Sequence, residues 1–206
     1  MQKKEKIQRK EKIGGKMEMK KLENKDRKIR FSLKGVTPAF VNAIRRMITT
    51  NVKTFAVENV NIYENTSVMF NEMLSHRLGM LPIQTDTKTY KKKEKVTLMV
   101  EKEGPCTVYS KDIKSTDPKI EVIDKKIPIV KLGKNQKIKI EMEATIDSGK
   151  RHSKWTPGIM TYNYNKDTFT VNMESFGGME PKEILEQATE EMITKTEELK
   201  KALSKV

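Results

Sequence analysis

The side chains that most often carry catalysis or hold metal ions are scarce in this sequence. Its 206 residues include one cysteine, Cys106, and two histidines, His76 and His152. Neither histidine has a second ligand at helical or hairpin spacing, and one thiol can form neither a disulfide framework nor a cysteine-based zinc or iron–sulfur site within the chain. The sequence therefore predicts no metal, no cofactor and a reducing, cytoplasmic setting.

Acidic side chains offer no better candidate for catalysis. The pairs Glu190-Glu191 and Glu197-Glu198 lie in one charged stretch near the end of the chain, where they fit a solvated helix face better than a general acid and base. Neither a glycine-rich phosphate loop nor a metalloprotease or esterase motif is present. We therefore expect a non-catalytic chain that acts by binding other proteins.

Two loops combine polar, basic and aromatic residues densely enough to be binding sites. The first, residues 64–67, leads into a segment that ends in His76 and Arg77. The second, residues 148–157, contains Arg151 and the only tryptophan, Trp155. A tryptophan in a basic loop can bind a protein, bind nucleic acid or only fill space, and the residues by themselves leave all three open.

Positive charge is concentrated at the amino terminus. The formal net charge is +14, and residues 1–34 alone hold 14 Lys and Arg against 5 Asp and Glu. Such a run either meets RNA or DNA phosphates or is a solvated tail, because charge by itself does not identify a nucleic-acid binder. No apolar run approaches the roughly 20 residues of a membrane span, and the basic terminus lacks the apolar region of a secretory signal.

The elements that position these residues begin after a basic arm, residues 1–16, which we expect to be disordered. Alternating apolar residues predict a strand at 29–33, and Thr37 followed by Pro38 predicts the start of a helix. The helix has an apolar stripe at positions i, i+3, i+4, i+7 and i+8, namely Phe40, Ala43, Ile44, Met47 and Ile48. Arg45 and Arg46 fall off that stripe, where they contact either solvent or a partner.

The middle of the chain has the sequence pattern of antiparallel β structure. Alternation predicts strands at 55–63, 96–100 and 138–146, and an edge strand around Pro128. Turn signals recur about every ten residues between them. One short helix is expected at 69–78, with Phe70, Met73, Leu74 and Leu78 on one face.

The carboxy-terminal part returns to mixed structure. A strand is expected at 169–173, and Pro181 opens a long helix that ends near residue 203. Its apolar positions form a coiled-coil-like seam, namely Leu185, Ala188, Met192, Leu199, Leu203 and Val206. The seam packs on the chain's own sheet, on a partner, or on both, and we favour both.

At several of these segments the sequence resembles a known family. The segments are Phe40 to Arg46, Ala56 to Ser67, His76 to Ile83 and Lys150 to Pro157. In this order they resemble the D polypeptide of archaeal DNA-directed RNA polymerase, whose family is similar to the third-largest subunit of eukaryotic polymerase II and to the amino-terminal domain of bacterial alpha. The resemblance covers about residues 17–206.

The resemblance implies an α+β fold with a discontinuous dimerisation domain and an inserted β-rich domain. The dimerisation domain would be an antiparallel sheet plus helices from both chain ends, residues 17–66 and 160–206, and the insert would span 67–159. Many relatives carry an iron–sulfur cluster or zinc in a cysteine-rich insertion, which the single Cys106 predicts to be absent here.

The resemblance also implies a non-catalytic scaffold that pairs with small subunit L. Subunits N and P and the large catalytic subunits would join this platform, with DNA contacted only indirectly and no membrane involved. The expected partner-binding residues are Phe40, Ile44, Arg45, Arg46, Met47, Ile48, His76, Arg77, Arg151, Trp155, Leu185, Met192, Leu199 and Leu203. The alternative is a basic RNA- or ribosome-associated binding protein, which would lose its partner on deletion of residues 1–16 while the scaffold would not.

Overall fold

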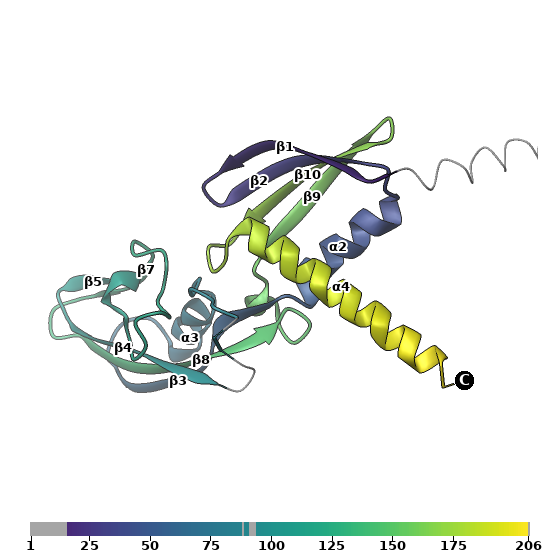
Figure 1. Cartoon of the computed structure of the whole chain (residues 1–206). Helices are drawn as coiled ribbons and strands as arrows, with labels where there is room; N and C mark the ends of the chain where they lie inside the picture. The colour runs from purple at the N-terminus through teal and green to yellow at the C-terminus, as the bar shows by residue number, and fades with distance from the viewer. Residues whose placement is uncertain (1–15, 88, 91–93, 206) are drawn as a thin grey trace, which may run out of the picture. The chain divides into compact units, whose positions relative to one another are not determined.

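The computed structural model describes residues 16–87, 89–90 and 94–205 and divides the chain into two compact units. Unit 1 combines the described parts of 1–52, 158–176 and 180–206, and unit 2 is formed by Lys53–Pro157 and Gly177–Met179 (Figure 1). Both units contain antiparallel strands and helices, which confirms the predicted α+β class. The expected basic arm lies outside the described residues, apart from Lys16.

Unit 1 is built on one sheet to which both ends of the chain contribute. The strands are β1 (Glu18–Lys25), β2 (Lys28–Lys34), β9 (Gly158–Asn165) and β10 (Thr168–Ser175), in the order β1-β2-β10-β9. The central pair, β2 and β10, runs antiparallel with Phe31 opposite Val171. Both side chains are buried because they face the helices.

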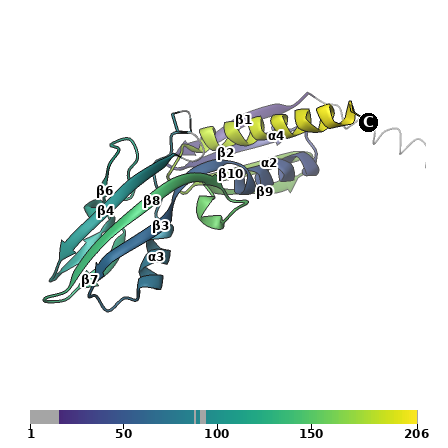
Figure 2. The ribbon, with the colours of Figure 1, turned by 90° about the horizontal axis from the view of Figure 1, so that it is seen from below.

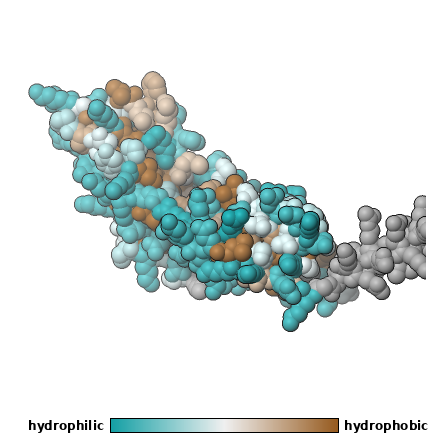
Figure 3. Space-filling view, turned by 90° about the horizontal axis from the view of Figure 1, so that it is seen from above, coloured by the Kyte–Doolittle hydropathy of each residue, from teal (hydrophilic) through white to brown (hydrophobic). Residues whose placement is uncertain are grey.

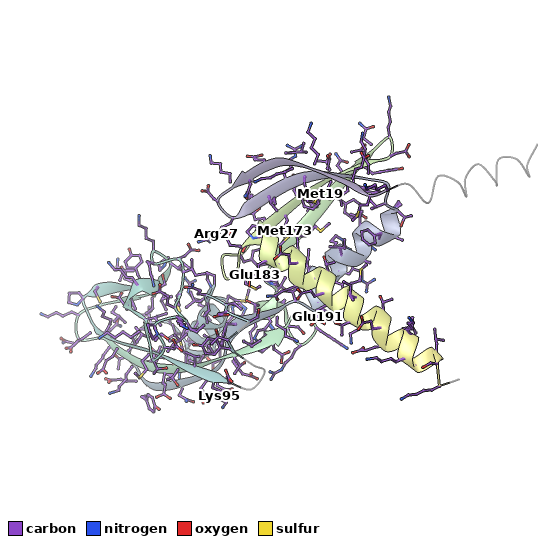
Figure 4. The ribbon with its side chains drawn as sticks, viewed as in Figure 1. Met19, Arg27, Lys95, Met173, Glu183 and Glu191 are labelled. Carbon is purple, nitrogen blue, oxygen red and sulfur yellow. The ribbon has the colours of Figure 1, made fainter. Side chains whose placement is uncertain are left out.

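Strand β1 was not predicted, because its sequence EMKKLENK lacks alternation. All eight of its residues are exposed, as suits an edge strand that only β2 supports. Met19 lies opposite Leu33 yet is 69% exposed, whereas Met173 of the inner strand β10 is 1% exposed (Figure 4). The edge of the sheet therefore carries apolar surface that the described residues leave open.

Two helices contact the sheet of unit 1 and each other: α2 (Pro38–Thr50) and α4 (Pro181–Leu203). As predicted, α2 starts where the Thr37 hydroxyl accepts a hydrogen bond from the backbone N–H of Phe40, at 3.2 Å. The buried side chain Val41 was missing from the predicted stripe, because α2 contacts both α4 and β9 and so buries a wider face than one stripe.

Unit 2 contains a four-stranded sheet and a separate two-stranded ribbon. The sheet has the order β3-β8-β4-β6, formed by β3 (Lys53–Asn65), β8 (Lys137–Ser148), β4 (Lys95–Glu103) and β6 (Lys114–Ser115). The ribbon pairs β5 (Cys106–Tyr109) with β7 (Pro128–Leu132). These strands confirm the predicted antiparallel β region.

The core of unit 2 lies between its strands and helix α3 (Asn71–Gly79), which contacts β3 (Figure 2). Leu74 and Leu78 of α3 are fully buried there. We expected Phe70 and Met73 on the same face, but the structure leaves them 73% and 58% exposed. Helix α3 has nine residues and buries a single line of side chains, so only Leu74 and Leu78 enter the core.

The outward side of the β3-β8-β4 sheet carries cross-strand charge pairs. Lys95 contacts Glu143 at 2.9 Å, and Lys139 contacts Glu101 at 3.3 Å. Pairs this exposed contribute little to stability individually, about 0–1 kcal/mol. Because the charged side chains lie on the outward side of these strands, the inward positions stay apolar. The strands therefore alternate although 34% of the residues in the chain are charged.

The two units divide at 52/53 and 157/158, whereas the expected boundaries were 66/67 and 159/160. The first boundary is earlier because β3 pairs with β8 from Lys53 to Asn65 and so belongs to unit 2. The short segment 177–179 also joins unit 2, where the carbonyl of Gly178 accepts the N–H of Thr85 at 2.8 Å. A Cβ on Gly178 would lie 2.7 Å from the carbonyl oxygen of Ile83, so glycine is required at this close approach.

Candidate protein-interaction sites

The basic loop after β8 is held to unit 2 by its tryptophan. Trp155 ends the short 3-10 helix η3 (Ser153–Trp155), is 1% exposed and donates its indole N–H to the carbonyl of Thr145 at 3.0 Å. The structure thus corrects its assignment as a partner-binding residue, because from this interior position the ring does not reach a partner. The single indole in the chain instead fixes the loop that carries its basic neighbours.

Arg151 also holds this loop to unit 2, through hydrogen bonds at the protein surface. Its guanidinium donates to both carboxylate oxygens of Glu58 on β3, at 3.0 Å for Nη1 to Oε2, and to Asp147 at 3.3 Å. The Thr145 hydroxyl donates to Glu58 Oε2 at 2.8 Å, and the guanidinium lies 4.9 Å from the centre of the Trp155 ring. Hydrogen bonds from Arg151 are the main reason that the pKa of Glu58 lies below its usual value.

Replacing Glu58 with glutamine is expected to lower the free energy of unfolding at pH 7 by about 1 kcal/mol, because the bidentate partner of Arg151 loses its charge. The figure is small because Arg151 is 51% exposed. The lowered pKa of Glu58 means that its contribution is present above the unfolded-state value of about 4.3 and is lost as pH falls through the folded-state value. In thermal melts, the difference between wild type and Glu58→Gln should therefore be full at pH 7 and should shrink as the pH falls below about 4.3.

A matched control for this prediction is Glu101→Gln, since Glu101 is 53% exposed and contacts Lys139 on the open side of the sheet. We expect a change within about 0.5 kcal/mol for this variant. Equal effects of the two substitutions at pH 7 would show that the Glu58–Arg151 contact does not fix the loop.

Lys154 is the basic group of the loop that points along β3. Its ammonium donates to the carbonyl of Val57 at 2.8 Å and lies 4.4 Å from the centre of the Trp155 ring. Among the described residues no carboxylate forms a salt bridge with it. Partial burial lowers the pKa of Lys154, an effect that nearby Glu58 only partly offsets.

A pocket of about 350 Å³ lies between this loop, β3 and the end of α3. Its lining residues are Val57, Glu58, Asn59, Val60, Ser75, His76, Gly79, Met80, His152 and Lys154. Both histidines of the chain therefore line one pocket, although they come from distant segments. The sequence singled out His76 but gave no signal that His152 or Lys154 would lie beside it.

Arg77, which the sequence grouped with His76, points elsewhere. Its guanidinium donates to the backbone carbonyls of Ile129 at 3.1 Å and Pro128 at 2.6 Å, which ties α3 to β7. The two neighbours thus differ in role: His76 lines the pocket, and Arg77 makes a structural contact within unit 2.

The predicted partner-binding residues of α2 divide by exposure. Ile48 is fully buried, so it belongs to the core of this chain and is corrected from a partner-binding position. Three others are half-buried, namely Phe40, Ile44 and Met47. Arg45 is half-buried and hydrogen-bonds the Asn42 side chain at 3.1 and 2.8 Å, whereas Arg46 is exposed.

Helix α4 changes character along its length. Its buried side chains, Pro181, Ile184 and Ala188, all lie in its first third, and Leu185 and Met192 of the predicted seam are half-buried. Beyond Met192 every described side chain is exposed, including Leu199 at 60% and Leu203 at 65%, while Val206 of the predicted seam lies outside the described residues. On the face shown in Figure 3, brown apolar patches lie on a surface that is otherwise mainly hydrophilic.

Other sites are not supported by the geometry. Within 16–87, 89–90 and 94–205, no three His, Cys, Asp or Glu side chains lie close enough together to hold a metal ion. Cys106 is half-buried, and its thiol contacts the carbonyl of Glu103 at 3.5 Å. In the same part of the chain, no helix is both long and apolar enough to cross a membrane.

Comparison with known proteins gives matches to RNA polymerase subunits. Residues 60–161 match the model of the RNA polymerase Rpb3/RpoA insert domain, which corresponds to most of unit 2. The DNA-directed RNA polymerase subunit Rpo3 of Methanocaldococcus jannaschii is 49% identical over 168 residues, covering 81% of this chain and 85% of that protein. The Rpo3 subunit of Pyrococcus furiosus is 43% identical over 154 residues, covering 72% of this chain and 59% of that protein, so the match spans about three fifths of the latter.

Proposed function

The chain belongs to the Rpo3 family of DNA-directed RNA polymerase subunits, and from this premise we propose that it is a non-catalytic scaffold of a cytoplasmic polymerase. In this proposal it pairs with small subunit L, and the pair forms a platform for the large catalytic subunits and for subunits N and P. Its contact with DNA is indirect, through the assembled enzyme.

The observation that carries the proposal is the uncovered half of α4. From Ile193 to Leu203 the helix buries none of its side chains, although Ile193, Leu199 and Leu203 are large and apolar. The half-buried stripe of α2 and the open β1 edge add further apolar surface to the same unit. Removing such surface from water stabilises a complex by roughly 25 cal/mol per Å², so a partner that covers unit 1 is favoured.

The experiment that tests the proposal is co-expression of the full chain with subunit L, followed by size-exclusion chromatography. We expect a stable pair with one copy of each chain, and poor solubility of the chain when it is expressed alone. A soluble, monodisperse monomer that does not bind subunit L would contradict the proposal.

Replacing Arg45 and Arg46 together with alanine is expected to leave the pair with subunit L intact but to weaken recruitment of the large catalytic subunits. Arg46 is exposed, and the Arg45 guanidinium hydrogen-bonds Asn42 of the same helix, so unit 1 needs little from either. Arginine presents planar, multidentate donors that suit a protein interface. Affinity pull-down of the large subunits onto the pair measures the effect. The control is Lys182→Ala, which removes an exposed side chain at the start of α4.

Recruitment equal to wild type by the double Arg45, Arg46 variant, with its fold intact, would show that this face of α2 is only solvated. Loss of the pair with subunit L would instead place both side chains at the pairing interface.

We further propose that this chain holds no iron–sulfur cluster and no zinc ion. One cysteine and two histidines supply too few ligands for the usual four-coordinate zinc or four-cysteine cluster site. Elemental analysis of the purified pair is expected to give well under one iron or zinc per chain. About one ion per chain, retained after chelator treatment, would overturn this proposal.

A further inference from the structure

The pocket between β3, α3 and the 148–157 loop has an excess of free hydrogen-bond donors. The Nδ1 atom of His152 accepts the backbone N–H of Lys154 at 3.1 Å, so the proton of the neutral ring resides on Nε2. The Lys154 ammonium has three hydrogens and donates one to the Val57 carbonyl. The Ser75 hydroxyl and the His76 ring add further polar groups to the same lining.

The acceptors nearest to Lys154, the Glu58 carboxylate and the Val57 carbonyl, are already engaged. Among the described residues of the lining Glu58 is the only one with a carboxylate, and both its oxygens accept hydrogen bonds from Arg151, with Thr145 donating to one of them. The Val57 carbonyl accepts from Lys154. A ligand that bonds to the Lys154 ammonium and to the Nε2–H of His152 must therefore bring acceptors of its own.

Charge favours an acceptor that is also negative. Lys154 is partly buried and has no salt bridge to a described carboxylate; the groups that face its charge are the Val57 carbonyl, the Trp155 ring and the more distant Glu58. A desolvated ammonium gains most from a directly bonded anion. The C-terminal end of α3 brings partial negative charge to the rim, which the charged Arg77 in its last turn partly offsets.

The rim of the pocket is apolar on the α3 side. Met80 lines the pocket and is 53% exposed, and Met73, seven residues earlier on the exposed side of α3, is 58% exposed. Methionine adapts to varied apolar partners. The surroundings thus suit a negative side chain that projects from an apolar stretch of polypeptide.

We propose that this pocket binds the carboxylate of a glutamate or aspartate in an apolar segment of a partner protein, with Lys154 and the two histidines as its donors. The inference rests on the proposed function only in taking the partner to be a protein of the same assembly. A nucleic-acid ligand fits less well, because the described lining offers no Phe, Tyr or Trp ring for base stacking.

The test uses the full chain, in its pair with subunit L if that is needed for solubility, labelled only in its histidine rings. The chain has two histidines, and both line the pocket, so every ring signal from this chain reports on the site. The probe is the capped peptide Ala-Leu-Glu-Leu-Ala, and the control probe replaces its Glu with Gln. At fixed pH we expect saturable shifts of both rings with the Glu peptide and about tenfold weaker binding of the Gln peptide, the difference between charged and neutral hydrogen bonds.

Matched variants identify the donor. Lys154→Met keeps an apolar stem beside Trp155 but removes the ammonium, and it should weaken binding of the Glu peptide about tenfold. Lys150→Met removes the same charge from an exposed position of the same loop outside the pocket and should leave binding unchanged. Circular dichroism checks that both variants fold.

Equal binding of the two peptides, no binding of either, or equal losses in the Lys154 and Lys150 variants would each overturn the proposal. Stronger ring shifts with inorganic phosphate or with an oligonucleotide than with the Glu peptide would overturn the assignment to a protein carboxylate. Failure of this test with a normal L pair would leave the scaffold function standing, whereas a chain that binds the peptide but not subunit L would contradict only the scaffold function.

Discussion

Replacement of Trp155 with alanine is expected to destabilise unit 2 by about 3–5 kcal/mol. The ring is 1% exposed, and its indole N–H satisfies the carbonyl of Thr145 at 3.0 Å. Alanine would leave a cavity under the 148–157 loop and take away the surface on which Arg151 and Lys154 rest, at 4.9 and 4.4 Å from the ring centre. The loss is a large fraction of the roughly 5–15 kcal/mol typical of a domain.

Urea unfolding followed by far-ultraviolet circular dichroism measures this effect, because the variant has no tryptophan left for fluorescence. Trp155→Phe is the matched control: it keeps most of the ring and loses the hydrogen bond, so a smaller loss of about 1–2 kcal/mol is expected. If the two units unfold in separate transitions, only the transition of unit 2 should move. An unchanged midpoint in Trp155→Ala would show that the loop is not anchored by its tryptophan.

The parts of the fold that followed from the sequence are those specified by local pattern. The alternation of Ile138, Ile140, Met142 and Ala144 predicted β8, and each of these side chains is buried. Thr37 predicted the start of α2 through a hydrogen bond that spans three residues. In both cases the signal lies within a few neighbouring residues, where periodicity and capping act.

The parts that did not follow depend on contacts between distant segments. Strand β1 has no alternation because an exposed edge strand buries neither face, so only its pairing with β2 defines it. Trp155 has no periodic partner that would mark it as buried, and its place depends on Thr145 across a turn. His76 and His152 share a pocket only because β3 lies between their two segments, which no spacing in the sequence encodes.

We expect the pair with subunit L to be most sensitive to substitution at the far end of α4. Leu199→Asp is expected to weaken the pair with subunit L by about 3–5 kcal/mol, because it would place an unpaired charge in a desolvated seam. This loss of binding energy corresponds to an increase in the dissociation constant of at least about 100-fold. Interfaces of permanent complexes typically bury about 2,000 Å² or more and are rich in apolar contacts, so a single charge at their centre is costly.

The same substitution should barely alter the chain by itself. Leu199 is 60% exposed, and no buried side chain follows Ala188 along the described part of the helix, so the thermal stability of the free chain is expected to change by no more than about 0.5 kcal/mol. Its solubility should rise, because one exposed apolar side chain becomes charged. A defect in pairing with no defect in folding separates an interface residue from a core residue.

Lys201→Asp is the matched control, because Lys201 is exposed two positions further along α4 and so projects from nearly the opposite side of the helix. Isothermal titration of purified subunit L into each variant, or size-exclusion chromatography of the co-expressed chains, gives the comparison. Leu199→Asp should elute as separate chains and Lys201→Asp as a pair. A Leu199→Asp pair as tight as wild type would show that subunit L does not cover this half of α4, and the exposed apolar positions at Ile193, Leu199 and Leu203 would then require a different partner.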